Sequence, residues 1–342
     1  MAYTTIKKPS NYFDTRTYSA SGAGSISDLN FQPDFIWFKN RTIAGDHGLF
    51  DAIRGVTKYL ISSSTSTGLT GNGTSSDFLS FDTNGFSYGT SSQLDVGAGT
   101  PVTWCWKANG SGSSNTDGSI TSTVSANTTS GFSIVSYAGS NSNITVGHGL
   151  GAVPKLIFIK NLSSVSSWTV YHNRLGASNR LILNSSAAQE STNQFSFGTS
   201  PTSSVFSLGG GYNDVCASGQ NYVAYCFSEV KGFSRFGSYI GRGSNLPFIY
   251  TGFKPAFVIW KGVAGESWGL VDNKRNLYNS TTQHIYPNLN DAEATQPPIM
   301  DFLSNGFKLR WTDSNINFSG NQYIYIAFAE EPLVGDNPAT AR

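Results

Sequence analysis

The sequence has little charge and no long apolar run. Charged residues make up 13% of its 342 positions, about half of the roughly 25% usual in soluble domains, and the net charge is only +1. A chain this neutral is poorly suited to binding nucleic acid through counterion release, so we predict no nucleic-acid partner. No stretch approaches the roughly 18 apolar residues of a membrane span, which predicts no membrane insertion. The opening MAYTTIKKPS lacks the apolar segment of a secretory signal.

Cysteine and the strong helix formers are also scarce. The chain has two methionines and is poor in leucine, lysine and glutamate, which argues against a mainly helical protein. Its three cysteines are an odd number, which excludes a complete disulfide framework. Cys105 and Cys226 lie inside apolar runs and are predicted to be small core residues.

Aromatic residues and turn formers are abundant instead. Phe, Tyr and Trp reach 13%, and there are 37 glycines. Aromatic and β-branched side chains suit pleated sheets, while Gly, Ser, Thr and Asn suit turns. The composition therefore predicts an all-β protein.

The chain contains three similar segments. Each combines a proline, an apolar run and a lysine six positions after the proline: FQPDFIWFKN at 31–40, AVPKLIFIKN at 152–161 and FKPAFVIWKG at 253–262. A second apolar motif follows each of them: VTWCWKA at 102–108, VAYCFSE at 223–229 and IYIAFAE at 324–330. The spacings Pro33 to Cys105, Pro154 to Cys226 and Pro255 to Ala327 are all 72 positions. One spacing kept three times indicates an internal repeat.

The repeats define the predicted domains. We expect three tandem β-sandwiches of about 100 residues, jelly-roll or lectin-like in form, which is the usual size of such a unit. Their predicted limits, with a Gly/Ser linker and a tail, are 1–109, 110–128 (linker), 129–231, 232–334 and 335–342 (tail). A feature shared by all copies serves the fold, so a function of one copy should lie where the copies differ.

Several aromatic residues are candidates for stacking on sugar rings, because an aromatic side chain combines apolar area with a polar handle. The candidate glycan-binding residues are Trp168, Tyr171, Trp260, Trp268 and Trp311. Trp168 and Trp268 occupy one repeat position, where the first copy has His47, so core packing is the alternative interpretation.

No catalytic, metal or cofactor site is predicted. The four histidines, His47, His148, His172 and His284, lack metal-ligand spacing. The GESWG segment around Ser267 resembles a nucleophile elbow, but its repeat partner lacks the glycines, and a strand is expected to follow. Glu229, Glu330 and Glu331 end the last strands of their copies, which favours a structural role over the carboxylate pair of a glycosidase.

The repeat motifs resemble an uncharacterised family of virion structural proteins in tailed bacteriophages, especially marine phages and cyanophages. The resemblance is carried by YCFSEVKGFSRFGSYIGRGS and the Pro255 motif within 225–276, FLSNGFKLR at 302–310 and YIAFAE at 325–330. It is weaker over 31–107 and weakest in the second copy. Members of that family are usually labelled tail fibre or virion structural protein.

The resemblance implies a virion location and supplies no catalytic motif to transfer, and no enzymatic activity is predicted. We expect a surface-exposed tail fibre, receptor-binding or adhesion component of a bacteriophage virion. Its expected partners are other virion proteins, further copies of the chain in a homo-oligomer, and a host surface glycan. The alternatives are a capsid decoration protein (a head fibre or cement protein), a carbohydrate-binding module and a polysaccharide depolymerase.

Overall fold

The fold was analysed in a computed structural model, which describes residues 4–70, 78–90, 97–195 and 198–340. In this part of the chain every paired strand of the named sheets is antiparallel, and helix is limited to η1 (Pro9–Asn11) and α1 (Ser314–Asn317). The prediction of an all-β protein is confirmed. Neither helical segment is long and apolar enough to cross a membrane.

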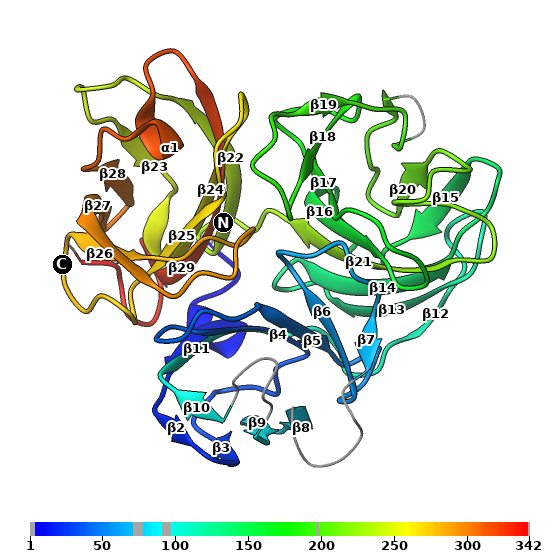
Figure 1. Cartoon of the computed structure of the whole chain (residues 1–342), viewed down its shortest axis with the longest axis horizontal. Helices are drawn as coiled ribbons and strands as arrows, with labels where there is room; N and C mark the ends of the chain where they lie inside the picture. The colour runs from blue at the N-terminus through cyan, green and yellow to red at the C-terminus, as the bar shows by residue number, and fades with distance from the viewer. Residues whose placement is uncertain (1–3, 71–77, 91–96, 196–197, 341–342) are drawn as a thin grey trace.

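The strands form three lobes arranged around a common centre (Figure 1). Each lobe has one large inner sheet. The first inner sheet has the order β1 (Phe13–Thr17), β11 (Pro101–Trp106), β4 (Phe35–Asn40), β5 (Gly48–Asp51), β6 (Lys58–Ile61), β7 (Leu69–Thr70). The second has the order β12 (Ser113–Asn115), β13 (Ser122–Asn127), β14 (Phe132–Ala138), β21 (Asn221–Ser228), β16 (Pro154–Asn161), β17 (Thr169–His172), β18 (Asn179–Ile182), β19 (Glu190–Ser191). The third has the order β22 (Ser234–Ile240), β29 (Gln322–Pro332), β24 (Phe253–Gly262), β25 (Gly269–Asp272).

Outer sheets cover the inner sheets on the side away from the centre, and in the first two lobes they have fewer strands than the inner sheet. The first lobe has the outer sheets β10 (Ala98–Gly99) with β2 (Ala20–Ser21), and β3 (Gly24–Ile26), β9 (Gly85–Tyr88), β8 (Phe78–Asp82). The second has β15 (Ile144–Gly147) with β20 (Val205–Leu208). The third has β23 (Phe248–Tyr250), β28 (Gly306–Leu309), β27 (Ala294–Leu303), β26 (Thr281–His284).

The last long strand of each lobe alternates between two cores. In β29, Ile324, Ile326 and Phe328 face the centre of the molecule, while Tyr323 and Tyr325 face the third outer sheet. The strands β11 and β21 alternate in the same way, and in them Cys105 and Cys226 are buried free thiols on the outer side. Because successive side chains of a strand point to opposite faces, a strand buried on both faces must be apolar throughout. The sequence pattern of residues 323–328 therefore correctly indicated an inner strand.

One central core joins the three lobes. Phe328 of the third lobe lies 5.0 Å from the ring of Phe13 in the first lobe and 5.9 Å from that of Phe227 in the second. Trp106 and Phe257 also contact this cluster. Each inner sheet thus buries one face against the other two inner sheets and its other face against the outer sheets of its own lobe.

The positions of proline and the Asn-Gly turns follow the geometry of the sheets. Pro154 begins β16, and Pro255 lies in β24 next to a register shift. A proline cannot donate to the ladder, so a strand start or a bulge accommodates it. The Asn-Gly pairs before Phe86 and Phe307 lie at the tight turns of the β8–β9 and β27–β28 hairpins, where the asparagine ends the turn and the glycine pairs with Asp82 or Leu303 of the preceding strand.

One expectation about the fold is wrong. The segment 110–128 is not a free linker, because it contains β12 and β13, which extend the second inner sheet beside β14. Buried Val124 and the hydrogen bond from the Asn109 amide to Ser125 Oγ hold it in place.

Candidate functional site

The repeated tryptophans bind the lobes to one another. Trp168 Nε1 of the second lobe donates to Ile61 O of the first at 2.9 Å, and Trp268 Nε1 of the third donates to Ile182 O of the second at 2.9 Å. His47, at the same repeat position in the first lobe, places Nε2 3.2 Å from Tyr286 O of the third. The three contacts run in one direction around the centre and close a ring.

The tautomer of His47 follows from its neighbours. Trp37 Nε1 donates to His47 Nδ1 at 2.9 Å, so Nδ1 carries no proton and Nε2–H is the donor to Tyr286 O. Burial and the nearby charge of Lys39 hold the pKa of His47 well below its usual value. A neutral histidine therefore performs in the first lobe the bonding role that tryptophan has in the other two.

Most of the predicted glycan-stacking residues are not accessible to a ligand. Trp168, Tyr171, Trp260 and Trp268 are all buried, so the prediction that these rings form a sugar platform is wrong. Trp260 Nε1 donates to Asn315 O at 3.0 Å, and Tyr171 packs against a ring of its own outer core. Trp311 is half-buried and meets His284 edge-on at 6.0 Å. Core packing, the alternative interpretation, describes these residues.

The repeated lysines are also internal. Lys160 Nζ donates to Thr65 O of the first lobe at 2.9 Å, and Lys261 Nζ donates to Ser186 O of the second lobe at 3.1 Å. Burial lowers the pKa of each of these two lysines to about 8. These lysines use carbonyl oxygens as acceptors across the lobe boundaries, which is a structural role.

A buried charge pair lies at two of the three lobe boundaries. Arg275 Nε lies 2.7 Å from Asp272 Oδ2, which also accepts a hydrogen bond from Trp104 Nε1 of the first lobe at 3.0 Å. Asp51 of the first lobe pairs with Arg54 and accepts from Tyr225 Oη of the second lobe at 2.7 Å. The carboxylates thus reach a hydrogen-bond donor in the neighbouring lobe.

The second lobe has a neutral pair at this position. His172 and Leu175 stand where the other lobes have aspartate and arginine. The residue of the third lobe that corresponds to Trp104 and Tyr225 is Ile326, which offers no side-chain donor. Burial lowers the pKa of His172 to about 3, so it stays neutral. An uncharged pair fits this boundary because a buried carboxylate needs a donor.

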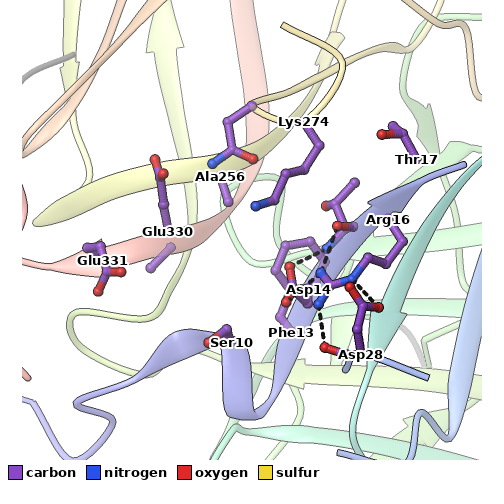
Figure 2. Close-up of a pocket in the computed structure, with 13 residues that line it drawn as sticks. Ser10, Phe13, Asp14, Arg16, Thr17, Asp28, Ala256, Lys274, Glu330 and Glu331 are labelled. Carbon is purple, nitrogen blue, oxygen red and sulfur yellow. Dashed lines mark hydrogen bonds and ion pairs between the residues drawn. The ribbon is translucent and has the colours of Figure 1, made fainter. Parts of the chain in front are cut away.

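A charged groove lies where the first and third lobes meet (Figure 2). Its volume is about 450 Å³. Asp14 and Arg16 of β1 form one side, Glu330 and Glu331 of β29 form the other, and Lys274 extends between them from the segment after β25 (Figure 2). The groove is therefore built from the beginning and the end of the chain.

The acidic groups of the groove already hold partners. Arg16 pairs with Asp14 at 2.7 Å and with Asp28 at 2.8 Å. Glu330 pairs with Lys254 at 3.3 Å, which agrees with the structural role expected for it. Glu331 accepts a hydrogen bond from Asn337 at 3.1 Å, and burial raises its pKa. These carboxylates are engaged within the chain, and their arrangement differs from a pair of carboxylates facing each other across a sugar.

The remaining motifs have structural surroundings. Ser267 is followed by β25, so GESWG lacks the strand-to-helix turn of a nucleophile elbow. In the part of the chain that the structure describes, no group of three or more His, Cys, Asp or Glu side chains could hold a metal ion.

The burial of His284 can be tested through the pH dependence of the free energy of unfolding. Its ring is stacked on Trp260 at 5.2 Å, and burial together with Arg275 lowers its pKa to about 3. The unfolded chain takes up a proton near pH 6.5, so the stabilisation is complete above that pH and is lost as the pH falls toward 3. We expect His284→Phe to gain about 1.4 kcal/mol over the wild type for each pH unit below about 6.

Urea unfolding of both proteins at a series of pH values measures this difference. An acid sensitivity of the variant equal to that of the wild type would contradict a neutral, buried His284.

The groove was not predictable from the sequence, because the residues that line it, such as Asp14, Lys274 and Glu330, are far apart in the chain. The exposed aromatic side chains of the third lobe were missed for another reason. Phe248 and Tyr250 flank Ile249 in PFIYTG, and a three-residue apolar run gives little sign of which side chains face solvent.

The strand order and the shared core define an all-β protein of three sheet-bearing lobes around one centre. Residues 8–332 match a family described as a domain of unknown function, DUF7483, and the chain belongs to this family. A search of curated proteins gave no match.

Proposed function

We propose that this protein is a structural component of a bacteriophage virion, exposed at the particle surface as a tail fibre, receptor-binding or adhesion component. The sequence resemblance to phage structural proteins suggests the location. The observation that carries the proposal is the central core, in which Phe13, Phe227 and Phe328 join the three lobes. A body closed in this way suits a component that must keep its shape outside a cell.

The three lobes are, in this proposal, tandem β-sandwich repeats of about 100 residues. Corresponding strands support the repeat: β1-β11-β4-β5, β14-β21-β16-β17 and β22-β29-β24-β25 follow one order. The two-sided burial of β29 supports the sandwich. Copies of the chain and other virion proteins are the proposed partners of the outer surfaces.

We propose a non-enzymatic role, which the paired carboxylates of the groove support. Asp14, Asp28 and Glu330 are each held by a cation, and Glu331 is held by Asn337. Capsid decoration is the second candidate for the same rigid body.

Immunogold labelling of purified particles that carry this protein tests the proposal, with mass spectrometry of the same particles as an independent measurement. We expect gold at the tail and peptides of the chain in the particle. Labelling spread over the head would assign the protein to capsid decoration. Absence from purified particles by both methods would overturn the proposal.

A further inference from the structure

The outer sheet of the third lobe carries two exposed aromatic rings on one face. Phe248 and Tyr250 alternate with buried Ile249 in β23, and 44% and 49% of their surfaces are exposed. Side chains two positions apart in a strand lie on the same face, about 7 Å apart along it. β23 is the edge strand of its sheet. We call this pair the β23 platform.

The other two copies have no aromatic residue at these positions. Ile26 pairs with Phe86 in the first lobe as Ile249 pairs with Phe307 in the third. By this register, Ser25 and Ser27 occupy in the first lobe the positions that Phe248 and Tyr250 occupy in the third. Both serines are exposed. In the second lobe, where Val146 pairs with Phe206, the corresponding residues are Thr145 and Gly147.

The difference between the copies points away from a structural role. A repeat needs its inward residues to fold, and Ile26, Val146 and Ile249 are apolar in all three copies. The outward rings are present in one copy only. Moreover, the exposed large aromatic side chains of the described residues all belong to the third lobe: Phe248, Tyr250, Tyr278 and Phe318.

The ring of Phe248 lies against the backbone of the neighbouring strand β28. A Cβ atom on Gly306 would come within 2.8 Å of Phe248 Cζ and 3.0 Å of Cε2. The ring therefore lies across the glycine, where no side chain separates it from the backbone. A ring held against the sheet presents its other face to solvent, which is the geometry for stacking a ligand.

Charged groups border the platform on the same face. Lys308 lies directly opposite Phe248 in the register, and Asp301 lies opposite Lys308. Asp301 accepts a hydrogen bond from Ser280 and pairs with Arg310 at 3.4 Å. Two cations, Lys308 and Arg310, therefore lie beside one carboxylate, that of Asp301. This carboxylate already pairs with Arg310 and accepts the hydrogen bond from the Ser280 hydroxyl.

We propose that the β23 platform binds an acidic pyranose, the repeating element of a uronate-containing surface glycan. The apolar C–H face of the sugar would stack on Phe248 and Tyr250, and its carboxylate would lie toward Lys308. The excess of positive charge beside the rings favours an acidic sugar over a neutral one. This inference deepens the proposed role in host attachment and rests on it for its biological setting.

Saturation-transfer difference NMR on the full chain tests the proposal, with methyl β-D-glucuronide and methyl β-D-glucoside as probes. We expect transfer to the ring protons of the glucuronide, at least a tenfold loss of the signal in the double variant Phe248→Ala/Tyr250→Ala, and a weaker signal in Lys308→Ala. Phe318→Ala is the matched control, because this ring is 55% exposed in the same lobe but lies outside the β23 sheet. Its signal should equal that of the wild type.

Three results would overturn the proposal. They are no transfer from the wild type to the glucuronide, full transfer from the double variant to the glucuronide, and equal transfer from the wild type to the neutral glucoside. Analytical ultracentrifugation of the same proteins tests whether a second copy of the chain covers the β23 platform instead. A dimer of the wild type that is lost in the double variant would show this. Failure of sugar binding in a protein found on particles rejects this inference alone, while binding by a protein absent from particles rejects only the virion proposal.

Discussion

Replacing Asp272 with alanine is expected to lower the free energy of unfolding by about 3–5 kcal/mol. The Asp272 and Arg275 side chains are both fully buried. Without the carboxylate, the guanidinium keeps only Glu293 as an ion-pair partner, at 2.8 Å, and Trp104 Nε1 loses its acceptor. The loss is large because Glu293 is shared with Arg41, so the buried charge of Arg275 is only partly compensated and keeps its desolvation cost. Urea unfolding followed by tryptophan fluorescence measures the change.

An exposed pair and a double variant separate the possible causes. Asp28 also pairs with an arginine, but its side chain is 70% exposed, so Asp28→Ala should cost no more than about 1 kcal/mol. The double variant Asp272→Leu/Arg275→Met removes both charges and should recover most of the loss. A double variant less stable than Asp272→Ala would contradict an uncompensated charge as the cause.

Replacing Phe328 with alanine is expected to cost about 3–5 kcal/mol and to weaken all three lobes together. Its ring lies within 6.1 Å of rings from each lobe, including Phe13, Phe227 and Phe257. A cavity at this point removes packing from three inner sheets at once. Thermal unfolding by far-UV circular dichroism and by tryptophan fluorescence should shift to lower temperature by the same amount with both probes.

The exposed ring of the same lobe provides the comparison. Phe318→Ala should change the stability by less than about 0.5 kcal/mol, since more than half of that side chain is exposed. Separate transitions of the three lobes in the Phe328→Ala variant would show that the central core does not couple their unfolding.

The aromatic residues show how far sequence reasoning reaches. Comparison of the repeats correctly assigned Trp168, Trp268 and His47 to equivalent positions in the three copies. It could not show that each of these side chains bonds to the next lobe, because a hydrogen bond to a backbone carbonyl such as Ile61 O leaves no sequence pattern. The same limit made buried rings look like candidates for ligand binding.

The sequence by itself determined the all-β class, the two-sided alternation of the strand at 323–328 and the correspondence of the three segments. These features depend on local chemistry, such as the apolar run of β29 and the Asn-Gly turns. Only the tertiary structure decided how the segments close around one core, which places Asp14 beside Glu330 in the groove and gives Asp272 a donor from Trp104. It also decided that Phe248 and Tyr250 face solvent. Closure and exposure depend on contacts between residues far apart in the chain, and no local pattern encodes them.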